Sequence, residues 1–458
     1  MALMAGISGI RGIVGETLTP SLAVEAGSAF AAHLGAFGTR NGKSGSPRVI
    51  VARDSRPSGP MVTSGVVAGL LASGYDVIDL GLATTPGAAV MVRELGAAGG
   101  IVVTASHNPS MWNGIKFLTS EGSAPPKAVA TQIIERFQTR RFTYVPVDRV
   151  GGLTGEDSTA TRHVERVLAI VDSARIRAQR LRLALDSVCG AGGRSGRVLL
   201  EALGCTVEHL HAEPTGQFPH APEPLAENLT ELAAATKRAG AAVGFAQDPD
   251  ADRLAIIDEN GRYIGEEYTL ALAARCILSA RPGPLVATLS TSRMVDDIAA
   301  GFGGTCRVYR SPVGEANVVE LMTSVGAVLG GEGNGGVIDP RVVDVRDSLT
   351  AMAITLQLMA ETGQPLSKLV DSLPRWRMVK QKFDCPPERI AQMIDKLRTS
   401  FAGQRISDLD GVRIDWPEGW VHVRGSNTEP IIRIIAEAAD EHAAQALVQR
   451  VRPLIDTL

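Results

Sequence analysis

Short runs of apolar residues recur along this chain, and each of them ends in small or polar residues. Such runs predict buried β-strands, and the longer mixed stretches between them predict helices. One unit of strand, helix, strand, helix and strand recurs three times before the pattern changes after Pro374. A repeat with so long a period indicates duplicated domains rather than a solenoid.

The strands of the three units occupy matching places. The first strands are expected in residues 48–55, 181–187 and 285–290, the second in 74–80, 204–210 and 304–309, and the third in 97–104, 240–246 and 325–330. Strands that alternate with helices predict mostly parallel sheets covered on both faces. After Pro374, two strand-like runs and a terminal helix from about Glu441 predict a smaller α+β domain.

The expected fold class is therefore α/β, with three duplicated domains of mixed, mostly parallel sheet and a smaller α+β C-terminal domain around a central cleft. The expected domains are residues 1–153, 154–260, 261–374 and 375–458. Each third strand runs into a loop of different composition, at residues 104–109, 248–253 and 331–336, and a fourth loop lies at 424–430. Ligands bind where parallel strands end, so these loops are the candidate site.

The first loop reads Thr-Ala-Ser-His-Asn-Pro and places Ser106 on a tight turn at the end of a buried strand. Pro109 prevents a regular helix or ladder from forming again at once. A serine so placed can act as a covalent relay if other groups activate it. His107 either assists Ser106 or braces the loop. No Gly-x-Ser-x-Gly motif surrounds Ser106, which argues against an α/β-hydrolase esterase.

The second loop carries three alternating acidic residues, Asp248, Asp250 and Asp252. In an extended segment all three carboxylates point to one side, and hard oxygen ligands of this kind suit Mg²⁺. A solvated acidic turn and an aspartyl-phosphate nucleophile of the dehalogenase type are the alternatives. An EF-hand loop is disfavoured because Arg253 stands where that loop requires glycine.

Two further loops offer polar groups to a ligand. Glu332 and Asn334 are set among glycines and suit sugar hydroxyls, although a flexible turn is an equally good interpretation. In the last domain a guanidinium, two hydroxyls and an amide suit a phosphate dianion, or else form an ordinary capped turn. These residues are Arg424, Ser426, Asn427 and Thr428.

Two basic residues lie near the first loop in the sequence or on a glycine-rich segment. Arg11 stands in a glycine-rich N-terminal stretch, and Lys116 follows Ser106 by ten residues. Both are candidates for handling charge or protons, although a lone Lys or Arg is more often a surface residue. The Gly42-Lys43-Ser44 triplet is not a P-loop, because Phe37 occupies the place of its first glycine.

Composition narrows the class of protein. The net charge of −3 provides no basic field for nucleic acid or an anionic membrane. The 5 cysteines are odd in number and form no CxxC pair, which argues against a zinc site and a disulfide framework. The N-terminus lacks a signal-peptide pattern, and the uncharged stretch 57–75 favours a packed helix over a membrane span. We expect a soluble, cytoplasmic protein.

The four loops together, in this order, resemble the motifs of the α-D-phosphohexomutase family, and the resemblance covers nearly the whole chain. It implies a four-domain, Mg²⁺-dependent isomerase that moves phosphate between C1 and C6 of a hexose. The expected route runs through a phosphoserine and a hexose 1,6-bisphosphate intermediate. The resemblance implies no nucleic-acid or membrane partner, and the expected assembly is a monomer or a homodimer.

The same resemblance implies roles for particular residues. Ser106 is the phosphorylated serine, and its phosphate joins Asp248, Asp250 and Asp252 in holding Mg²⁺. Arg11 and Lys116 match residues that assist acid–base steps, and His107 belongs to the same catalytic loop. The residues expected to bind the sugar and its other phosphate are Arg253, Glu332, Asn334, Arg424, Ser426, Asn427, Thr428 and Arg433.

The sequence specifies the preferred hexose less fully than it specifies the type of reaction. The opening Ser8-Gly-Ile-Arg-Gly12 resembles the phosphoglucosamine mutase branch. Most bacterial members of that branch have Ser-Gly-His where this chain has Asn334-Gly-Gly336, which is similar to archaeal-type members. We favour glucosamine phosphate, with glucose or mannose phosphate as the alternative. Alternatives of another class are a serine-dependent sugar phosphatase and an inactive sugar-phosphate sensor.

Overall fold

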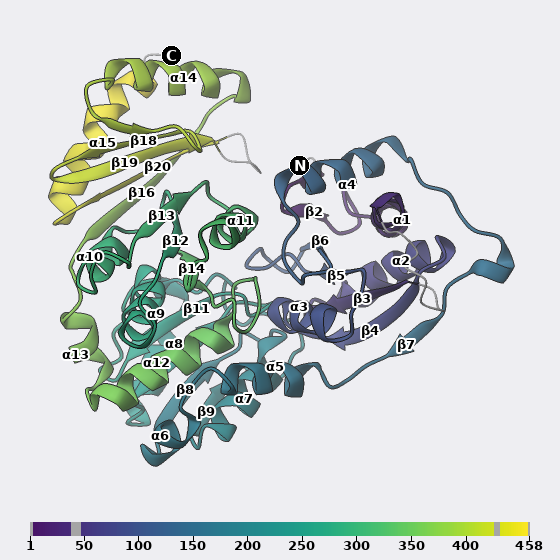
Figure 1. Ribbon diagram of the computed structural model, residues 1–458, viewed down its shortest axis with the longest axis horizontal. Helices are drawn as coiled ribbons and strands as arrows, with labels where there is room; N and C mark the ends of the chain where they lie inside the picture. The colour runs from purple at the N-terminus through teal and green to yellow at the C-terminus, as the bar shows by residue number, and fades with distance from the viewer. Residues whose placement is uncertain (1–2, 38–46, 426–430, 457–458) are drawn as a thin grey trace.

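The computed structural model describes residues 3–37, 47–425 and 431–456, and within them the chain folds into four domains, each built on its own sheet (Figure 1). The first three domains carry mixed sheets, as the sequence predicts, and the smaller last domain, predicted as α+β, carries a fully antiparallel one. Of the helices described, none is both long and apolar enough to cross a bilayer.

The first sheet has the strand order β1-β2-β6-β5-β3-β4-β7. Its parallel strands β3 and β5 carry nearly unbroken apolar runs because helices cover both of their faces, whereas the third parallel strand, β4, also contains Asp76 and Asp79. The elements are β1 Met4–Gly6, β2 Gly9–Ile13, α1 Pro20–Phe37, β3 Arg48–Arg53, α2 Gly59–Ala72, β4 Asp76–Leu82, α3 Thr85–Glu94, β5 Gly99–Val103, β6 Trp112–Leu118, α4 Lys127–Thr139, η1 Val147–Arg149 and β7 Leu153–Gly155.

The second sheet has the order β11-β10-β8-β9, in which β11 alone is antiparallel to its neighbour. Its elements are α5 Thr159–Leu168, α6 Ser173–Ala178, β8 Arg182–Asp186, α7 Gly192–Ala202, β9 Thr206–Leu210, η2 Ala226–Asn228, α8 Thr230–Arg238, β10 Val243–Gln247 and β11 Leu254–Asp258. The strand expected from Gly240 begins three residues later, because Gly240 adopts a left-handed φ of +59° in the turn after α8.

The third sheet repeats this plan in the order β13-β12-β14-β15. Its elements are α9 Glu267–Ala280, β12 Leu285–Thr288, α10 Met294–Ala300, β13 Val308–Ser311, α11 Glu315–Val325, β14 Leu329–Glu332, β15 Gly336–Ile338, α12 Ser348–Thr362 and α13 Leu366–Asp371. The strand expected from Val325 begins at Leu329, because α11 extends to Val325 and Gly326 caps it in the left-handed region.

The last domain is a sheet of order β16-β20-β19-β18-β17, with all neighbours antiparallel. Its elements are β16 Arg377–Asp384, α14 Pro387–Ser400, β17 Arg405–Ser407, β18 Val412–Trp416, β19 Gly419–Gly425, β20 Ile431–Ala438 and α15 Glu441–Asp456. The apolar sides of the strands form a core of their own with α14 and α15.

The face of the first sheet that α1, α2 and α4 cover has its own hydrophobic core, and the second and third domains each have a smaller one; the largest core runs through all three domains. Helix α12 lies at its centre and packs on α9, α5 and α7, so it joins the second and third domains. Burial of so much apolar surface at domain boundaries holds the sheets in fixed relative positions. The loops at the edges of these three sheets are therefore held close to one another.

An antiparallel strand follows the third strand of every repeated unit, which the sequence pattern did not predict. The pairs are β5 with β6, β10 with β11 and β14 with β15. Each of the three singled-out loops is the connection within such a pair. Because the pairs occupy equivalent places in the duplicated sheets, the three loops lie at equivalent sheet edges. These edges face a common centre of the three domains.

Candidate active site

Ser106 lies on the connection between β5 and β6 in a strained backbone conformation. Its φ is +50°, in the left-handed region that non-glycine residues rarely adopt. The backbone N–H of Ser106 donates to Thr104 Oγ1 at 2.9 Å, and the side chain is buried. Its hydroxyl donates to Asp248 Oδ2 at 2.8 Å and lies 3.4 Å from His107 Nδ1. The loop of the first domain thus meets the acidic loop of the second.

Arg56 holds the Ser106 loop from behind, and the sequence analysis missed it. The guanidinium is fully buried, and its Nε donates to Asp54 Oδ2 at 3.1 Å. Its two terminal nitrogens donate to four backbone carbonyls at 2.6–2.9 Å, those of Ser106, Asn108, Pro109 and Trp112. The signal was present, because Asp54-Ser55-Arg56 follows strand β3 at the same sheet edge as Ser106.

The acidic loop is a turn rather than the extended segment that the alternating carboxylates suggested. Its backbone reverses because Ala251 adopts a φ of +56° and donates its N–H to the Asp248 carbonyl at 2.9 Å. That expectation was wrong because the segment connects the antiparallel strands β10 and β11. The three carboxylates still converge, with one oxygen from each within 4.8 Å of the others.

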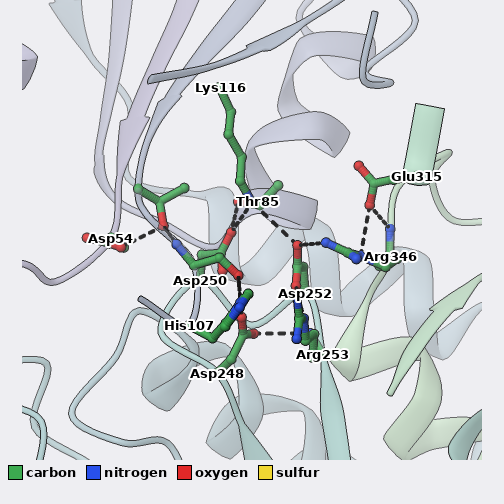
Figure 2. A network of polar contacts seen from close by, with 12 residues as sticks. Asp54, Thr85, His107, Lys116, Asp248, Asp250, Asp252, Arg253, Glu315 and Arg346 are labelled. Carbon is green, nitrogen blue, oxygen red and sulfur yellow. Dashed lines mark hydrogen bonds and ion pairs between the residues drawn. The ribbon is translucent and has the colours of Figure 1, made fainter. Parts of the chain in front are cut away.

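Cations and hydroxyls surround these carboxylates unevenly (Figure 2). Lys116 Nζ donates to Asp250 Oδ2 at 2.6 Å and lies 3.4 Å from Asp252 Oδ2. Thr85 Oγ1 also donates to Asp250 Oδ2, at 2.6 Å. A second oxygen of each, Asp250 Oδ1 and Asp252 Oδ1, is buried with no hydrogen-bond partner among the residues that the structure describes. Two buried carboxylate oxygens of this kind fit a divalent cation.

The same arrangement perturbs the pKa values of the cluster. Burial, and then the carboxylates of Asp252 and Asp250, raise the pKa of Asp248 well above its ordinary value. Burial also disfavours ionised Asp250, but the Lys116 ammonium outweighs it and lowers the pKa of Asp250. In turn, burial opposes protonated Lys116, while the two neighbouring carboxylates prevail and raise its pKa. Lys116 is therefore a firmly protonated cation.

His107, Arg11 and Arg253 extend the site around Ser106. Arg11 Nη1 donates to Asn108 Oδ1 at 3.1 Å, and the Arg253 backbone N–H donates to Asp248 Oδ1 at 3.1 Å. The positive charge of Arg253, then burial and Arg11, lower the pKa of His107 well below its ordinary value. The imidazole is therefore neutral at physiological pH.

Arg346, a residue that the sequence analysis did not single out, connects the third loop to the acidic turn. Arg346 Nη2 contacts Asp252 Oδ2 at 2.5 Å, and Nη1 forms an ion pair with Glu332. Glu315 accepts the Arg346 backbone N–H at 2.9 Å. Asn334 Oδ1 is buried and has no hydrogen-bond partner within the described parts of the chain. Arg346 therefore joins the Glu332 loop to the acidic turn, although a lone arginine in the sequence gave no sign of it.

The fourth loop connects to the third rather than to Ser106. Arg424 Nε donates to Asp410 Oδ2 at 2.9 Å, and the same oxygen accepts the Val313 N–H at 3.1 Å. The adjacent Gly314 N–H donates to Glu332 Oε1 at 3.1 Å. Arg433 stands opposite Arg424 in the β19–β20 ladder. The remaining predicted residues of this loop, Ser426, Asn427 and Thr428, lie outside the described residues.

Comparison with known families gives four matches that follow one another along the chain. The matched models are described as phosphoglucomutase/phosphomannomutase α/β/α domain I at residues 2–144, domain II at 161–261 and domain III at 265–376, and as the C-terminal domain of the same family at 378–454.

Individual relatives agree with this order of domains. The chain is 38% identical to a phosphoglucomutase/phosphomannomutase of Thermococcus kodakarensis, with 98% of this chain and 97% of the relative covered. It is 36% identical to a probable phosphoglucosamine mutase of Methanopyrus kandleri, covering 96% and 95% of the two chains. A crystal structure of a phosphoglucomutase/phosphomannomutase family protein from Burkholderia thailandensis superposes with a TM-score of 0.86 at 30% identity, covering 99% and 96%.

Proposed function

This chain belongs to the phosphoglucomutase/phosphomannomutase family, and on that premise we propose that it interconverts glucosamine 6-phosphate and glucosamine 1-phosphate. As a member of that family it is a phosphohexomutase, which is an isomerase. One observation supports the mechanism above all others. The Ser106 hydroxyl donates to Asp248 at 2.8 Å, inside a converging set of carboxylates.

Ser106 is the proposed carrier of the phosphoryl group. Asp248, Asp250 and Asp252 would hold a metal ion, which we infer to be Mg²⁺ because all three donors are carboxylate oxygens. When bound, this ion neutralises negative charge on the phosphoryl oxygens. The chain adds fixed positive charge of its own at the same place through Lys116 and Arg253. Phosphoryl transfer depends chiefly on such positioning and charge neutralisation.

The proposed transfer is balanced in atoms and protons. A sugar hydroxyl oxygen attacks the phosphorus on Ser106, so a new O–P bond forms and the Ser106 O–P bond breaks. Neutral His107 accepts the hydroxyl proton, and protonated Lys116 gives a proton to the serine oxygen. The hexose 1,6-bisphosphate reorients in the site, so that its other phosphate faces Ser106. That phosphate then returns to Ser106 by the reverse step. Arg11 assists these steps as a nearby cation.

The sugar is proposed to lie between the third and fourth loops. Glu332 and Asn334 would accept hydrogen bonds from its hydroxyl groups, and Asn334 Oδ1, buried with no partner in the described ranges, supports this role. Arg424, with Ser426, Asn427, Thr428 and Arg433, would hold the phosphate that does not react. One distal-phosphate site that accepts either end of the bisphosphate makes both orientations productive.

The preference for glucosamine has support from charge. Arg346 pairs with Glu315 and Glu332 beside the sugar loop, so two carboxylates face this one cation there, apart from Asp252, which is proposed to hold the metal. An ammonium group at C2 of the sugar suits that surplus. Several relatives at 33–36% identity are named probable phosphoglucosamine mutase. The name of the relative at 38% identity makes glucose or mannose phosphate the second candidate.

Turnover on the 6-phosphates of glucosamine, glucose and mannose, measured side by side, tests this proposal. We expect kcat/KM to be at least tenfold higher for glucosamine, and a higher value for glucose or mannose would overturn the choice of sugar. Ser106→Ala should abolish interconversion. Release of inorganic phosphate without interconversion would favour a phosphatase, and full activity of Ser106→Ala would rule out the phosphoserine route.

A further inference from the structure

Two groups of metal-ligating side chains occur among the residues that the structure describes, and the second of them has no part in the proposed reaction. It consists of Asp186, His211 and His220. Asp186 is the last residue of β8, and His211 directly follows β9, so both stand where parallel strands of the second sheet end. His220 comes from the following segment, which returns across the same edge.

The two imidazoles bracket one buried carboxylate. His211 Nδ1 lies 3.1 Å from Asp186 Oδ1, and His220 Nε2 lies 3.1 Å from Asp186 Oδ2. In a tetrahedral zinc site neighbouring ligand atoms stand about 3.3 Å apart, because each bond is about 2.0–2.1 Å long. The observed 3.1 Å lies close to that value for each histidine, although each nitrogen faces a different oxygen of Asp186 and 3.1 Å is also an ordinary hydrogen-bond length. Each histidine side chain is 18% exposed, so solvent can reach the place where the three ligand atoms meet.

A contact on the outer side of His220 shows which of its ring nitrogens carries a proton. His220 Nδ1 lies 2.9 Å from the Ala221 carbonyl oxygen, which can only accept a hydrogen bond. Nδ1 therefore carries the proton, and in a neutral imidazole Nε2 then points its lone pair at Asp186. In the imidazolium form the same Nε2 donates to Asp186: burial opposes this form, but the hydrogen bonds to Asp186 and Ala221 outweigh it and raise the pKa of His220, so a metal ion would have to displace that proton. A histidine that donates outward to a backbone carbonyl is also the usual arrangement behind a metal ligand.

His211 repeats this arrangement on the other carboxylate oxygen. Its Nε2 lies 3.5 Å from Glu231 Oε2, which again offers an acceptor on the outer side. Its backbone has a φ of +48°, a strained conformation for this residue type that aims the ring at Asp186. Two inner nitrogens therefore face one carboxylate. Imidazole nitrogens favour a borderline metal of the zinc class over Mg²⁺, which prefers oxygen ligands.

We propose that Asp186, His211 and His220 form a second divalent-metal site, of the zinc class, with a coordination position open to water. This site shares no residue with the acidic turn that contains Asp248, and metal binding to it does not require the mutase reaction. The metal would tie the segment 211–224 to the end of β8. His211 and His220 would each hold one end of the loop between them.

That segment reaches the active site, so fixing it has a consequence. A Cβ atom on Gly216 would stand 2.1 Å from the Ser55 carbonyl oxygen, which shows how closely the segment approaches the first domain. The Phe218 ring lies under the Arg56 guanidinium, 5.0 Å from its centroid. Glu223 Oε1 lies 3.8 Å from both His107 Nε2 and Arg253 Nη1. A metal at Asp186 would therefore brace one wall of the Ser106 site.

Binding of Zn²⁺ and Co²⁺ to the full chain in saturating Mg²⁺ tests the proposal. We expect one Zn²⁺ per chain by competition with a chromophoric chelator, and a Co²⁺ absorption spectrum of tetrahedral type. His220→Ala and the milder His220→Gln should each weaken Zn²⁺ binding at least tenfold. Asp250→Asn, which alters the acidic turn, should leave it within twofold. His209→Ala is the matched control, because His209 bonds to Ser187 Oγ beside the cluster but lies outside it.

A second readout reports on the brace itself. Amide hydrogen exchange in 211–224 should slow when Zn²⁺ is added to the wild type and should not change in His220→Gln, provided that far-UV circular dichroism shows the variant folded. Absence of stoichiometric Zn²⁺ binding would overturn the proposal, as would Zn²⁺ binding that survives His220→Gln or disappears in Asp250→Asn. In those cases protons on the two imidazoles, rather than a metal, hold the cluster together.

Discussion

Replacing Arg56 by lysine separates positioning of the Ser106 loop from chemistry at Ser106. The guanidinium touches no proposed substrate atom, yet it donates to four carbonyls of the loop and its flanks and to Asp54. Lysine keeps the charge but has three donors on one nitrogen instead of a five-donor fork. At least two of these five acceptors, the four carbonyls and Asp54, must therefore lose the donor that Arg56 gives them.

The size of the effect follows from those lost bonds. A buried acceptor left unsatisfied costs about 1–3 kcal/mol, so Arg56→Lys should destabilise the chain by about 2–6 kcal/mol. The strained φ of Ser106 is then held less firmly, and misplacement of a reacting group by about 1 Å can cost about 100-fold in rate. We expect kcat to fall about 100-fold while KM changes less than threefold.

Three measurements check this prediction: steady-state kinetics, the midpoint of urea unfolding, and amide hydrogen exchange over residues 104–112. Arg48→Lys is the matched control. Arg48 begins strand β3, the strand that leads to Arg56, is exposed, and donates to one carbonyl, that of Leu95, at 2.7 Å. Its replacement should change stability by less than about 0.5 kcal/mol. If Arg56→Lys kept kcat within threefold and the same urea midpoint, the positioning argument would be refuted.

Three further predictions concern charge. Lys116→Met removes the partner of a buried carboxylate and should cost about 3–5 kcal/mol by urea unfolding, together with most of kcat; wild-type stability would show that the pair is not buried as described. Asp250→Asn should weaken Mg²⁺ binding at least tenfold by calorimetry, and unchanged affinity would exclude it as a ligand. Burial raises the pKa of Glu267 from an ordinary 4.5 to about 8. Between pH 4.5 and 8 the folded state therefore keeps a proton that the unfolded state loses, and the free energy of unfolding falls as the pH rises through this range. Glu267→Gln should remove that contribution, at most about 5 kcal/mol, and equal pH slopes of the two melting curves would contradict it.

Much of the fold could be predicted from the sequence because its signals are local. The buried strands β3, β5 and β8 are nearly unbroken apolar runs, and the change after Pro374 marked the antiparallel domain. The antiparallel partners β6, β11 and β15 were missed, since pairing direction depends on contacts between distant segments. Their absence from the prediction also made the acidic turn look extended.

The candidate site divides in the same way. Ser106 and the acidic triad stand out because several functional groups are adjacent in the sequence. Arg56 and Arg346 do not, since each acts through partners far along the chain: Arg56 through carbonyls about fifty residues away, and Arg346 through Asp252, which is 94 residues away. Single basic residues are common on surfaces, so only the fold distinguishes these two.

The most direct test of the central claim follows one phosphoryl group. The chain is incubated with hexose 1,6-bisphosphate labelled with phosphorus-32, and the peptide that contains Ser106 is isolated and analysed by mass spectrometry. Our account predicts that the label appears on Ser106 and passes to the sugar when unlabelled hexose 1-phosphate is added. Interconversion of the sugar phosphates with no label on Ser106, or with label that never leaves it, would contradict the account.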